Sequence, residues 1–176
     1  MNAAISFFNS ILWHLIPPTR AFSLKRKLLR LAGAEVGENV RFASSVRTYV
    51  GGPLIIGPNT WVGHDTLFVG GNAHIEIGAN CDIAPRVSFI TGTHKIEANG
   101  PKASGEGYSL PITVGDGCWI GAGAMLLGGS VVGAHSIVAA GAVVRGEFPA
   151  YSVLGGVPAK ILGSLQQTET DETSAD

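Results

Sequence analysis

The chain has 176 residues, enough for one domain with a sizeable hydrophobic core and short for two. Charged residues make up only 14% of it and aromatic residues 7%, while there are 25 glycines, a composition typical of many short strands joined by tight corners. A net charge of −1 gives no reason to expect nucleic-acid binding, and two cysteines are too few for the disulfide framework of a small secreted domain. Neither a cleavable signal peptide nor a bilayer-spanning apolar run is apparent, so we expect a cytoplasmic protein.

Residues 1–35 differ in character from the rest of the chain. Apolar residues recur at helical spacing as far as Pro17-Pro18, and a second helical stretch follows from Ala21 to Leu31. Five of the twelve Lys and Arg residues fall between Arg20 and Arg30, with no acidic residue among them. This N-terminal helical segment fits two interpretations: a cap that closes the open end of a repeat array, or a peripheral membrane contact through residues 1–30. The cap is favoured because terminal repeats need covering whatever the function, and the second interpretation would place the protein at the inner face of the membrane.

A six-residue repeat begins at Val36. Its first position is apolar in fourteen of fifteen units, and its fourth position is Gly, Asn or Asp in eleven. Gly, Asn and Asp tolerate the positive φ that a sharp corner requires, and small residues at the fifth position leave room for large first-position residues in a narrow interior. The repeat therefore predicts an all-β solenoid of about five triangular turns, with three units to a turn. The first positions are Val36, Phe42, Thr48, Ile56, Val62, Phe68, Ile77, Ile83, Phe89, Val114, Ile120, Leu126, Val132, Val138 and Val144.

Extra residues interrupt the repeat after each of the first three turns. The interruptions are Leu54-Ile55, residues 74–76 and a long loop at residues 95–113, and all three leave from the same corner of the solenoid. Residues 165–176 are polar and acidic, which predicts a disordered tail. Cys81 and Cys118 occupy fifth positions in neighbouring turns, so we expect buried, stacked thiols with no disulfide and no nucleophilic role.

The repeat resembles that of the left-handed parallel β-helix, or hexapeptide-repeat, acyltransferases, most closely from Ile77 onward. The likeness is carried by the segments IGANCDIAPRVSFITGTH, GYSLPITVGD, CWIGAGAMLLGGSVVG, AAGAVV and GGVPAKIL. These are similar to galactoside, maltose and nodulation acetyltransferases, and equally to the acetyltransferases of capsule and O-antigen clusters. The resemblance covers about 110 residues. It implies a left-handed β-helix domain over residues 36–164, acetyl-CoA as co-substrate and a homotrimer whose site lies between neighbouring chains.

His94 ends the third turn, immediately before the long loop. A lone histidine at such a position is ordinarily a surface residue, but the resemblance matches it to the catalytic base of the family. Imidazole is suited to take the proton of an acceptor hydroxyl as it attacks a thioester. A zinc site like that of the carbonic anhydrases of this fold needs three converging histidines, and no two histidines here are closer than ten residues. We therefore expect no bound metal.

The resemblance also assigns residues to acetyl-CoA. A tryptophan after the long loop matches one that lines the cofactor groove of the family, and three small residues leave room for the pantetheine arm, although repeat geometry explains them equally well. Two cations match phosphate-binding positions, with solvated surface charges as the alternative. The expected cofactor-binding residues are Trp119, Gly121, Ala122, Ala140, Arg145 and Lys160.

The acceptor side departs from the family pattern. The family holds the sugar with an Asn and an Asp on the second turn, and the matching positions here are Gly63 and Gly71 or its neighbour Asn72. The candidates for binding the acceptor are therefore Asp65, Asn72 and Tyr108, each of which also fits an ordinary corner or loop residue.

Together these features predict an acetyl-CoA-dependent O-acetyltransferase that acts on a sugar or glycan precursor in cell-surface polysaccharide biosynthesis. His94 is the expected general base, and transfer is direct, without an acyl-enzyme. Two alternatives stay open: an N-acetyltransferase of a nucleotide-linked amino sugar, and a non-catalytic β-helical scaffold.

Overall fold

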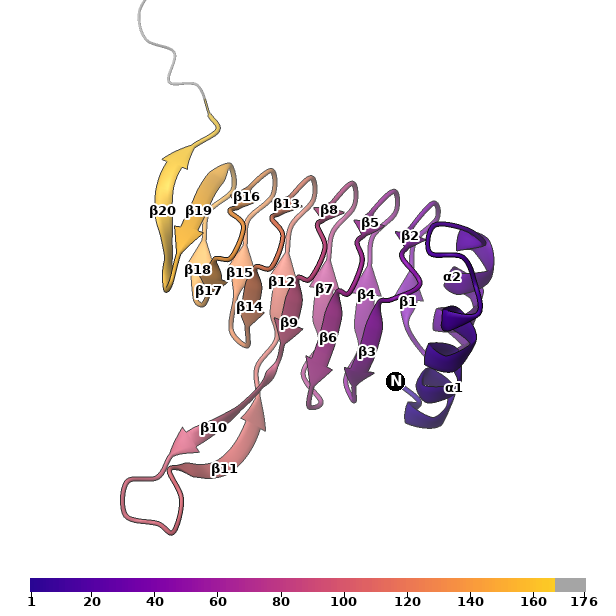
Figure 1. Ribbon diagram of the computed structural model, residues 1–176. Coiled ribbons are helices and arrows are strands. Elements are labelled where there is room, and N and C mark those ends of the chain that lie inside the picture. The colour runs from indigo at the N-terminus through magenta and orange to yellow at the C-terminus, as the bar shows by residue number, and fades with distance from the viewer. Residues whose placement is uncertain (167–176) are drawn as a thin grey trace, which may run out of the picture.

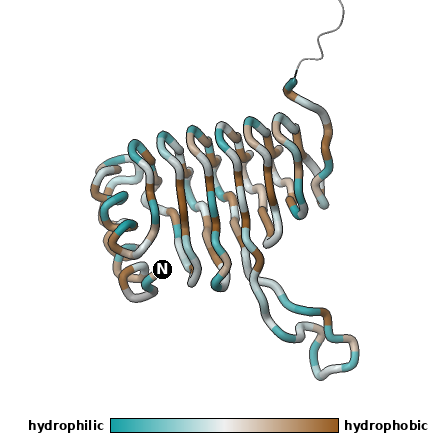
Figure 2. Tube along the Cα trace, turned by 180° about the vertical axis from the view of Figure 1, so that it is seen from behind, coloured by the Kyte–Doolittle hydropathy of each residue, from teal (hydrophilic) through white to brown (hydrophobic). Residues whose placement is uncertain are grey.

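The computed structural model of the chain describes residues 1–166, apart from the side chains of Ala3, Ala4, Ser10 and His14. The predicted acidic tail, residues 165–176, therefore lies almost entirely outside the described residues. Two helices lead into a column of short parallel strands, and a long hairpin arm leaves the column near its middle (Figure 1). Hydrophobic segments recur in every turn of the column (Figure 2).

Three sheets form the faces of the column. The first sheet contains β1 (Glu35–Val36), β4 (Leu54–Ile56), β7 (Ile75–Ile77), β12 (Ile112–Val114), β15 (Val131–Val132) and β18 (Glu147–Phe148). The second contains β2 (Arg41–Phe42), β5 (Trp61–Val62), β8 (Asp82–Ile83), β13 (Trp119–Ile120), β16 (Ile137–Val138), β19 (Ser152–Gly156) and β20 (Ala159–Ser164). The third contains β3 (Arg47–Val50), β6 (Leu67–Gly70), β9 (Ser88–Ile90), β14 (Met125–Leu127) and β17 (Val143–Val144). Within these three sheets all pairs are parallel except β19 with β20, so the predicted all-β solenoid is confirmed.

The column continues beyond the five turns that the repeat predicts. Strand β18 pairs with β15 and β19 pairs with β16, which adds two sides of a sixth turn. Val132 is in register with Phe148, only four residues after Val144, so this corner is two residues shorter than the regular unit. A strict six-residue count misses the last turn because it passes over this shortened corner. Strand β20 then folds back antiparallel on β19 and covers the edge of the second sheet.

At two of the three corners of the column, the residue at the fourth position of the repeat adopts positive φ in most turns. In the first corner, between the first and second sheets, Asn39, Asn59, Asn80, Gly117 and His135 all have φ between 55° and 67°. Arg86 also adopts positive φ at the second corner, so the column imposes this backbone even on residues that do not favour it. At the third corner, the fourth-position glycines of the three turns that carry insertions, Gly51, Gly71 and Gly92, are not among the residues of positive φ, whereas Gly129 of the following turn has a φ of 89°.

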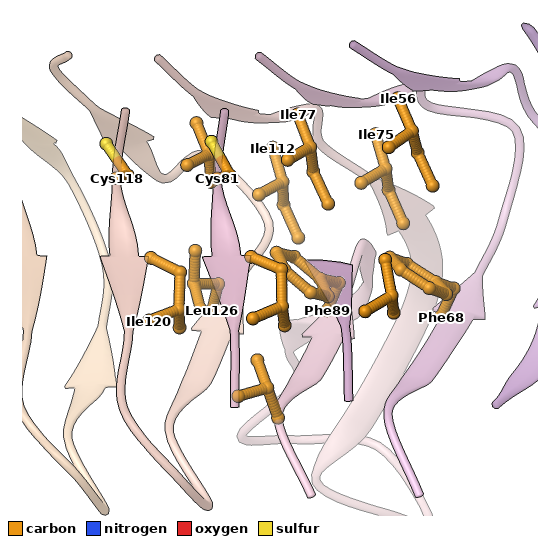
Figure 3. Packing of buried hydrophobic residues seen from close by; sticks show 14 of the residues in the cluster. Ile56, Phe68, Ile75, Ile77, Cys81, Phe89, Ile112, Cys118, Ile120 and Leu126 are labelled. Atoms are coloured by element: carbon orange, nitrogen blue, oxygen red, sulfur yellow. The ribbon is translucent and has the colours of Figure 1, made fainter. Parts of the chain in front are cut away.

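The core is a stack of equivalent positions. First-position side chains from Val36 to Val144 point inward and are buried, apart from Thr48. The rings of Phe68 and Phe89 stack at 5.0 Å, and inserted residues at the third corner also fill the interior, with Ile75 in register with Ile112 (Figure 3). Burial of aliphatic surface in this continuous column holds the turns together.

The two cysteines lie in this stack as predicted. Both are free and buried, and each thiol donates to a backbone carbonyl of the next turn, Cys81 to Gly115 and Cys118 to Gly133, both at 3.2 Å (Figure 3). Interaction with the Cys118 side chain, together with burial, raises the pKa of the Cys81 thiol. Cys81 is therefore a packing residue that stays protonated.

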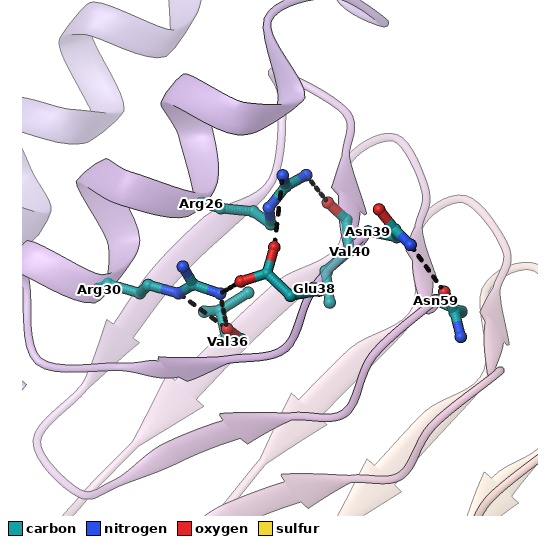
Figure 4. A network of polar contacts seen from close by, with 7 residues as sticks. All are labelled: Arg26, Arg30, Val36, Glu38, Asn39, Val40 and Asn59. Carbon is teal, nitrogen blue, oxygen red and sulfur yellow. Dashed lines mark hydrogen bonds and ion pairs between the residues drawn. The ribbon is translucent and has the colours of Figure 1, made fainter.

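The N-terminal helices α1 (Ala3–His14) and α2 (Phe22–Leu31) cover the first turn (Figure 1). Trp13 packs against Phe42 at 5.7 Å between ring centroids. Arg26 and Arg30 bond the backbone carbonyls of Val40 and Val36 and pair with Glu38 (Figure 4). No helix within residues 1–166 is long and apolar enough to cross a bilayer.

Lys25 of α2 is buried, which is unusual for a lysine on a surface helix. Its side chain is completely buried, and its Nζ donates to the carbonyls of Pro18 and Phe42, both at 3.0 Å. Burial lowers the pKa of the Lys25 ammonium. The spacing of basic residues in a helix does not reveal this, because the acceptors are backbone groups of the neighbouring turn and loop.

Replacing Lys25 with methionine is expected to lower the free energy of unfolding by about 2 kcal/mol, because two carbonyls lose a charged donor in a buried setting. Chemical denaturation followed by tryptophan fluorescence measures the change. Lys27→Met is the matched control: Lys27 is exposed on the same helix, and its replacement should stay within about 0.5 kcal/mol of wild type. Equal stability of the two variants would show that Lys25 does not fasten the cap.

Candidate active site

The arm forms one side of a hollow at the third corner. Residues 95–113 were expected to be a loop, but they belong largely to a β-hairpin in which β10 (Gly92–Ile96) pairs with β11 (Ser104–Ser109). An open hollow of about 470 Å³ lies where the hairpin joins the column. It is lined by Gly70, Gly71, Asn72, Gly92, Thr93, His94, Gly107, Tyr108 and Ser109.

His94 is held on β10 by the opposite strand of the arm. Its Nδ1 lies 2.9 Å from the carbonyl oxygen of Gly105. A carbonyl only accepts hydrogen bonds, so Nδ1 carries the proton of the neutral ring and Nε2 keeps its lone pair. Gly107 lies opposite His94 in the register, and a Cβ there would come within 3.4 Å of the ring. The hairpin therefore orients an exposed imidazole whose Nε2 is ready to accept a proton.

Two of the three predicted acceptor residues share this hollow. Asn72 lies at the third corner just before the second insertion, and Tyr108 pairs with Thr93 on the arm; both side chains are exposed. The floor is built from glycines and from Ser109, whose Oγ accepts from the backbone N–H of Ala73 at 3.1 Å. Asp65 lies elsewhere, exposed at the second corner with a φ of 58°, and the structure does not bring it to His94.

The predicted cofactor residues lie mainly on another face. Trp119 is 54% exposed on the second sheet, while Ala122 and Ala140 are exposed at the second corner. Gly121 is buried in the stack: a Cβ there would lie 2.5 Å from the backbone N of Ala140, so close stacking of turns accounts for this glycine. Within one chain, the third sheet separates these residues from the hollow of His94.

The two predicted phosphate-binding cations lie toward the C-terminal end of the column. Arg145 is exposed directly after β17, and Lys160 is exposed on β20, where it pairs with Gly155. Guanidinium and ammonium groups form strong, charge-assisted hydrogen bonds with phosphate. No group of three or more potential metal ligands occurs in the part of the chain that the structure describes.

Two features of the site lie beyond the sequence motifs. One is the Gly105 carbonyl, a backbone group that only the pairing of the arm brings to His94. The other is Asp82, an exposed residue in register with Trp119 on one side and Trp61 on the other. Both tryptophans and Asp82 occupy the same outward position, the sixth, of their units. This shared position is the only sequence feature that indicates their alignment on the second sheet.

Comparison with known proteins places this geometry in a family. The family model "Bacterial transferase hexapeptide (six repeats)" matches residues 111–146. Galactoside O-acetyltransferase of Escherichia coli K12 is 30% identical over 145 residues, which cover 82% of this chain and 70% of that enzyme. The chain belongs to the hexapeptide-repeat acetyltransferase family.

Other members of the hexapeptide-repeat acetyltransferase family agree with this assignment. A protein of Saccharomyces cerevisiae named as an acetyltransferase is 35% identical over 124 residues, and the match spans 70% of this chain and 61% of that protein. The crystal structure of a hexapeptide-repeat acetyltransferase from Vibrio cholerae O1 biovar eltor, complexed with acetyl coenzyme A, superposes with a TM-score of 0.71 at 27% identity, over 93% of this chain and 88% of that one. The fold is thus the left-handed parallel β-helix that the resemblance implied.

Proposed function

We propose that the protein transfers an acetyl group from acetyl-CoA to a hydroxyl of a sugar or glycan precursor. The single observation that carries the proposal is the bond from His94 Nδ1 to the Gly105 carbonyl, because it leaves Nε2 free to act as a base beside an open hollow. The family supplies the reaction class, and one of its members is named for galactoside O-acetylation. The reaction would belong to the synthesis of cell-surface polysaccharide in the cytoplasm.

In the proposed reaction, Nε2 of His94 takes the proton of the acceptor hydroxyl while its oxygen attacks the thioester carbonyl carbon. A carbon–oxygen bond forms, the carbon–sulfur bond breaks, and the proton passes from the imidazolium to the departing thiolate. The products are the O-acetylated sugar and coenzyme A. No side chain is acylated, in keeping with the absence of a reactive thiol in the hollow, since both cysteines are buried in the core.

The proposal includes a homotrimer. Trp119 and His94 project from different parts of one column, so a second chain is needed to bring a cofactor face against the hollow. Side-by-side packing of three columns around a threefold axis would bring a cofactor face against a hollow at each of the three interfaces. Acetyl-CoA would then lie between chains, with its phosphates toward Arg145 and Lys160 and its thioester toward His94.

Asn72 and Tyr108 are proposed to bind the acceptor. Both are exposed, both line the hollow, and neither is needed to hold His94. Replacing both, as Asn72→Ala with Tyr108→Phe, is expected to raise KM for the acceptor about tenfold, with KM for acetyl-CoA changed less than twofold. Asp65→Ala serves as the comparison, because Asp65 lies away from the hollow. If KM for the acceptor and KM for acetyl-CoA rose equally, Asn72 and Tyr108 would maintain the shape of the site and would not bind the acceptor.

The deciding experiment measures coenzyme A release with a panel of sugars and nucleotide sugars that carry either free hydroxyl or free amino groups. Acetylation of hydroxyl acceptors, abolished in His94→Ala, supports the proposal. Acetylation of amino acceptors alone would make the protein an N-acetyltransferase of an amino sugar. No turnover, together with no thermal shift on addition of coenzyme A, would identify a non-catalytic scaffold.

A further inference from the structure

Helix α1 turns its apolar side away from the protein. Six of its flanking and interior residues are between 36% and 79% exposed, although all are large and hydrophobic. They are Ile5, Phe7, Phe8, Ile11, Leu12 and Leu15. A single exposed leucine is ordinary, but six on one side of a short helix form a contiguous patch that calls for a partner.

The opposite side of α1 is more polar. Ser6, Asn9 and Trp13 follow helical spacing and are the buried residues there, and the Asn9 side-chain amide donates to the carbonyl of Leu28 at 2.8 Å. An amphipathic helix that serves only its own core buries its apolar stripe and exposes its polar one. Here the arrangement is reversed, so packing on the column does not account for the apolar residues.

Large hydrophobic side chains are also exposed on α2 and on the first turn. Leu24 and Leu31 of α2 are 43% and 69% exposed, on the same side as the exposed Lys27. On the other flank, Phe7 lines an open hollow of about 320 Å³ with Tyr49, which is 56% exposed. We call the six residues of α1 with Leu24 and Leu31 the end face, since the helices lie at the end of the column opposite the C-terminal strands (Figure 1).

Charge distinguishes between possible partners of the end face. The first 34 residues contain five Lys and Arg and no acidic residue. Lys25, Arg26 and Arg30 are engaged with carbonyls and with Glu38, whereas Arg20 and Lys27 are exposed and take part in none of the ion pairs among the described residues. Two copies of this surface would repel each other, while an anionic surface would attract it.

We propose that the end face binds the surface of a bilayer that contains anionic lipid. Large aliphatic and phenyl side chains enter the boundary between headgroups and acyl chains, Tyr49 lies at the level of the headgroups, and Lys27 and Arg20 contact lipid phosphate. A lipid surface suits a convex helix, since it needs no matching protein shape. The inference goes beyond the proposed reaction and holds for one chain; in a trimer of parallel columns, three end faces would point the same way and bind with avidity.

The test is co-sedimentation with vesicles of phosphatidylcholine alone and of phosphatidylcholine with phosphatidylglycerol. We expect the protein to bind the anionic vesicles and to stay in the supernatant with the neutral ones. The double variant Phe8→Gln, Leu15→Gln should bind at least about tenfold more weakly, because two apolar side chains that would enter the bilayer are lost. Lys27→Gln should bind about fivefold more weakly.

Leu162→Gln is the matched control: Leu162 is 67% exposed at the opposite end of the column, and its replacement should leave vesicle binding unchanged. Thermal unfolding checks each variant, and Lys27→Gln decides the matter if the double variant fails to fold. Failure of wild type to bind anionic vesicles, or wild-type binding by the variants, would overturn the proposal. If the double variant formed a smaller oligomer than wild type in the absence of lipid, the end face would instead be a contact between subunits. Activity on a free sugar reports separately on the proposed reaction.

Discussion

His94→Ala is expected to lower kcat for acetyl transfer by about 10²–10⁴-fold, the range by which a positioned general base accelerates such reactions. The imidazole is exposed on the arm and is held by one bond to the Gly105 carbonyl, so its loss removes no core contact and should leave the fold intact. Steady-state release of coenzyme A with a saturating acceptor measures the effect, and circular dichroism confirms folding.

The control for this prediction is His135→Ala. His135 is exposed at the first corner, where its ring stacks on Tyr151 at 5.2 Å, and it lies outside the hollow. Its replacement should leave kcat within about twofold of wild type. If His94→Ala retained more than a few per cent of wild-type kcat, the base would have to be sought elsewhere in the hollow.

Trp119→Ala is expected to lower kcat/KM for acetyl-CoA at least about tenfold, and mixing it with His94→Ala should restore activity. The shared site needs intact His94 from one chain and intact Trp119 from its neighbour. In trimers reassembled from equal amounts of the two variants, about one quarter of the sites meet both conditions. The mixture should therefore reach about one quarter of the wild-type kcat/KM for acetyl-CoA, which is above the value of either variant alone.

This mixing experiment separates two arrangements that point substitutions cannot distinguish. If His94 and Trp119 served a site within one chain, every site in the mixed trimers would carry one defect, and activity would stay at the level of the two variants alone. Unmixed variants carried through the same reassembly provide the baseline. Sedimentation velocity before and after reassembly verifies that chains have exchanged into trimers.

The hollow at the third corner and the end face lie in different parts of the molecule. The hollow is built on the third turn, where the arm leaves, and the end face covers the first turn (Figure 1). Substitutions in the hollow should therefore leave vesicle binding unaffected, and substitutions in the end face should leave acetyl transfer to a free sugar unaffected. Binding at the end face would set the column upright on the bilayer, with the hollow of His94 two turns away from the lipid surface.

Much of the fold follows from the sequence alone because the repeat is short and its constraints are local. A large first-position residue and a small fifth-position residue have only one way to pack in a narrow column. The buried stack, the two free stacked cysteines and the corner that carries every insertion could therefore all be predicted. His94 could be placed for the same reason, since it ends a regular turn just before the longest insertion. The family motif then indicated its role.

Other features depended on contacts between segments distant in sequence, which no local pattern encodes. The corner shortened by two residues became clear only from the pairing of Val132 with Phe148, and the burial of Lys25 only from carbonyls of the adjacent loop and turn. Pairing of β10 with β11 brought Gly105 to His94, and the choice of which side of α1 faces the column left its phenylalanines and leucines outside. Helical spacing specifies a stripe of apolar residues, but the neighbours against which a helix packs decide whether that stripe is buried.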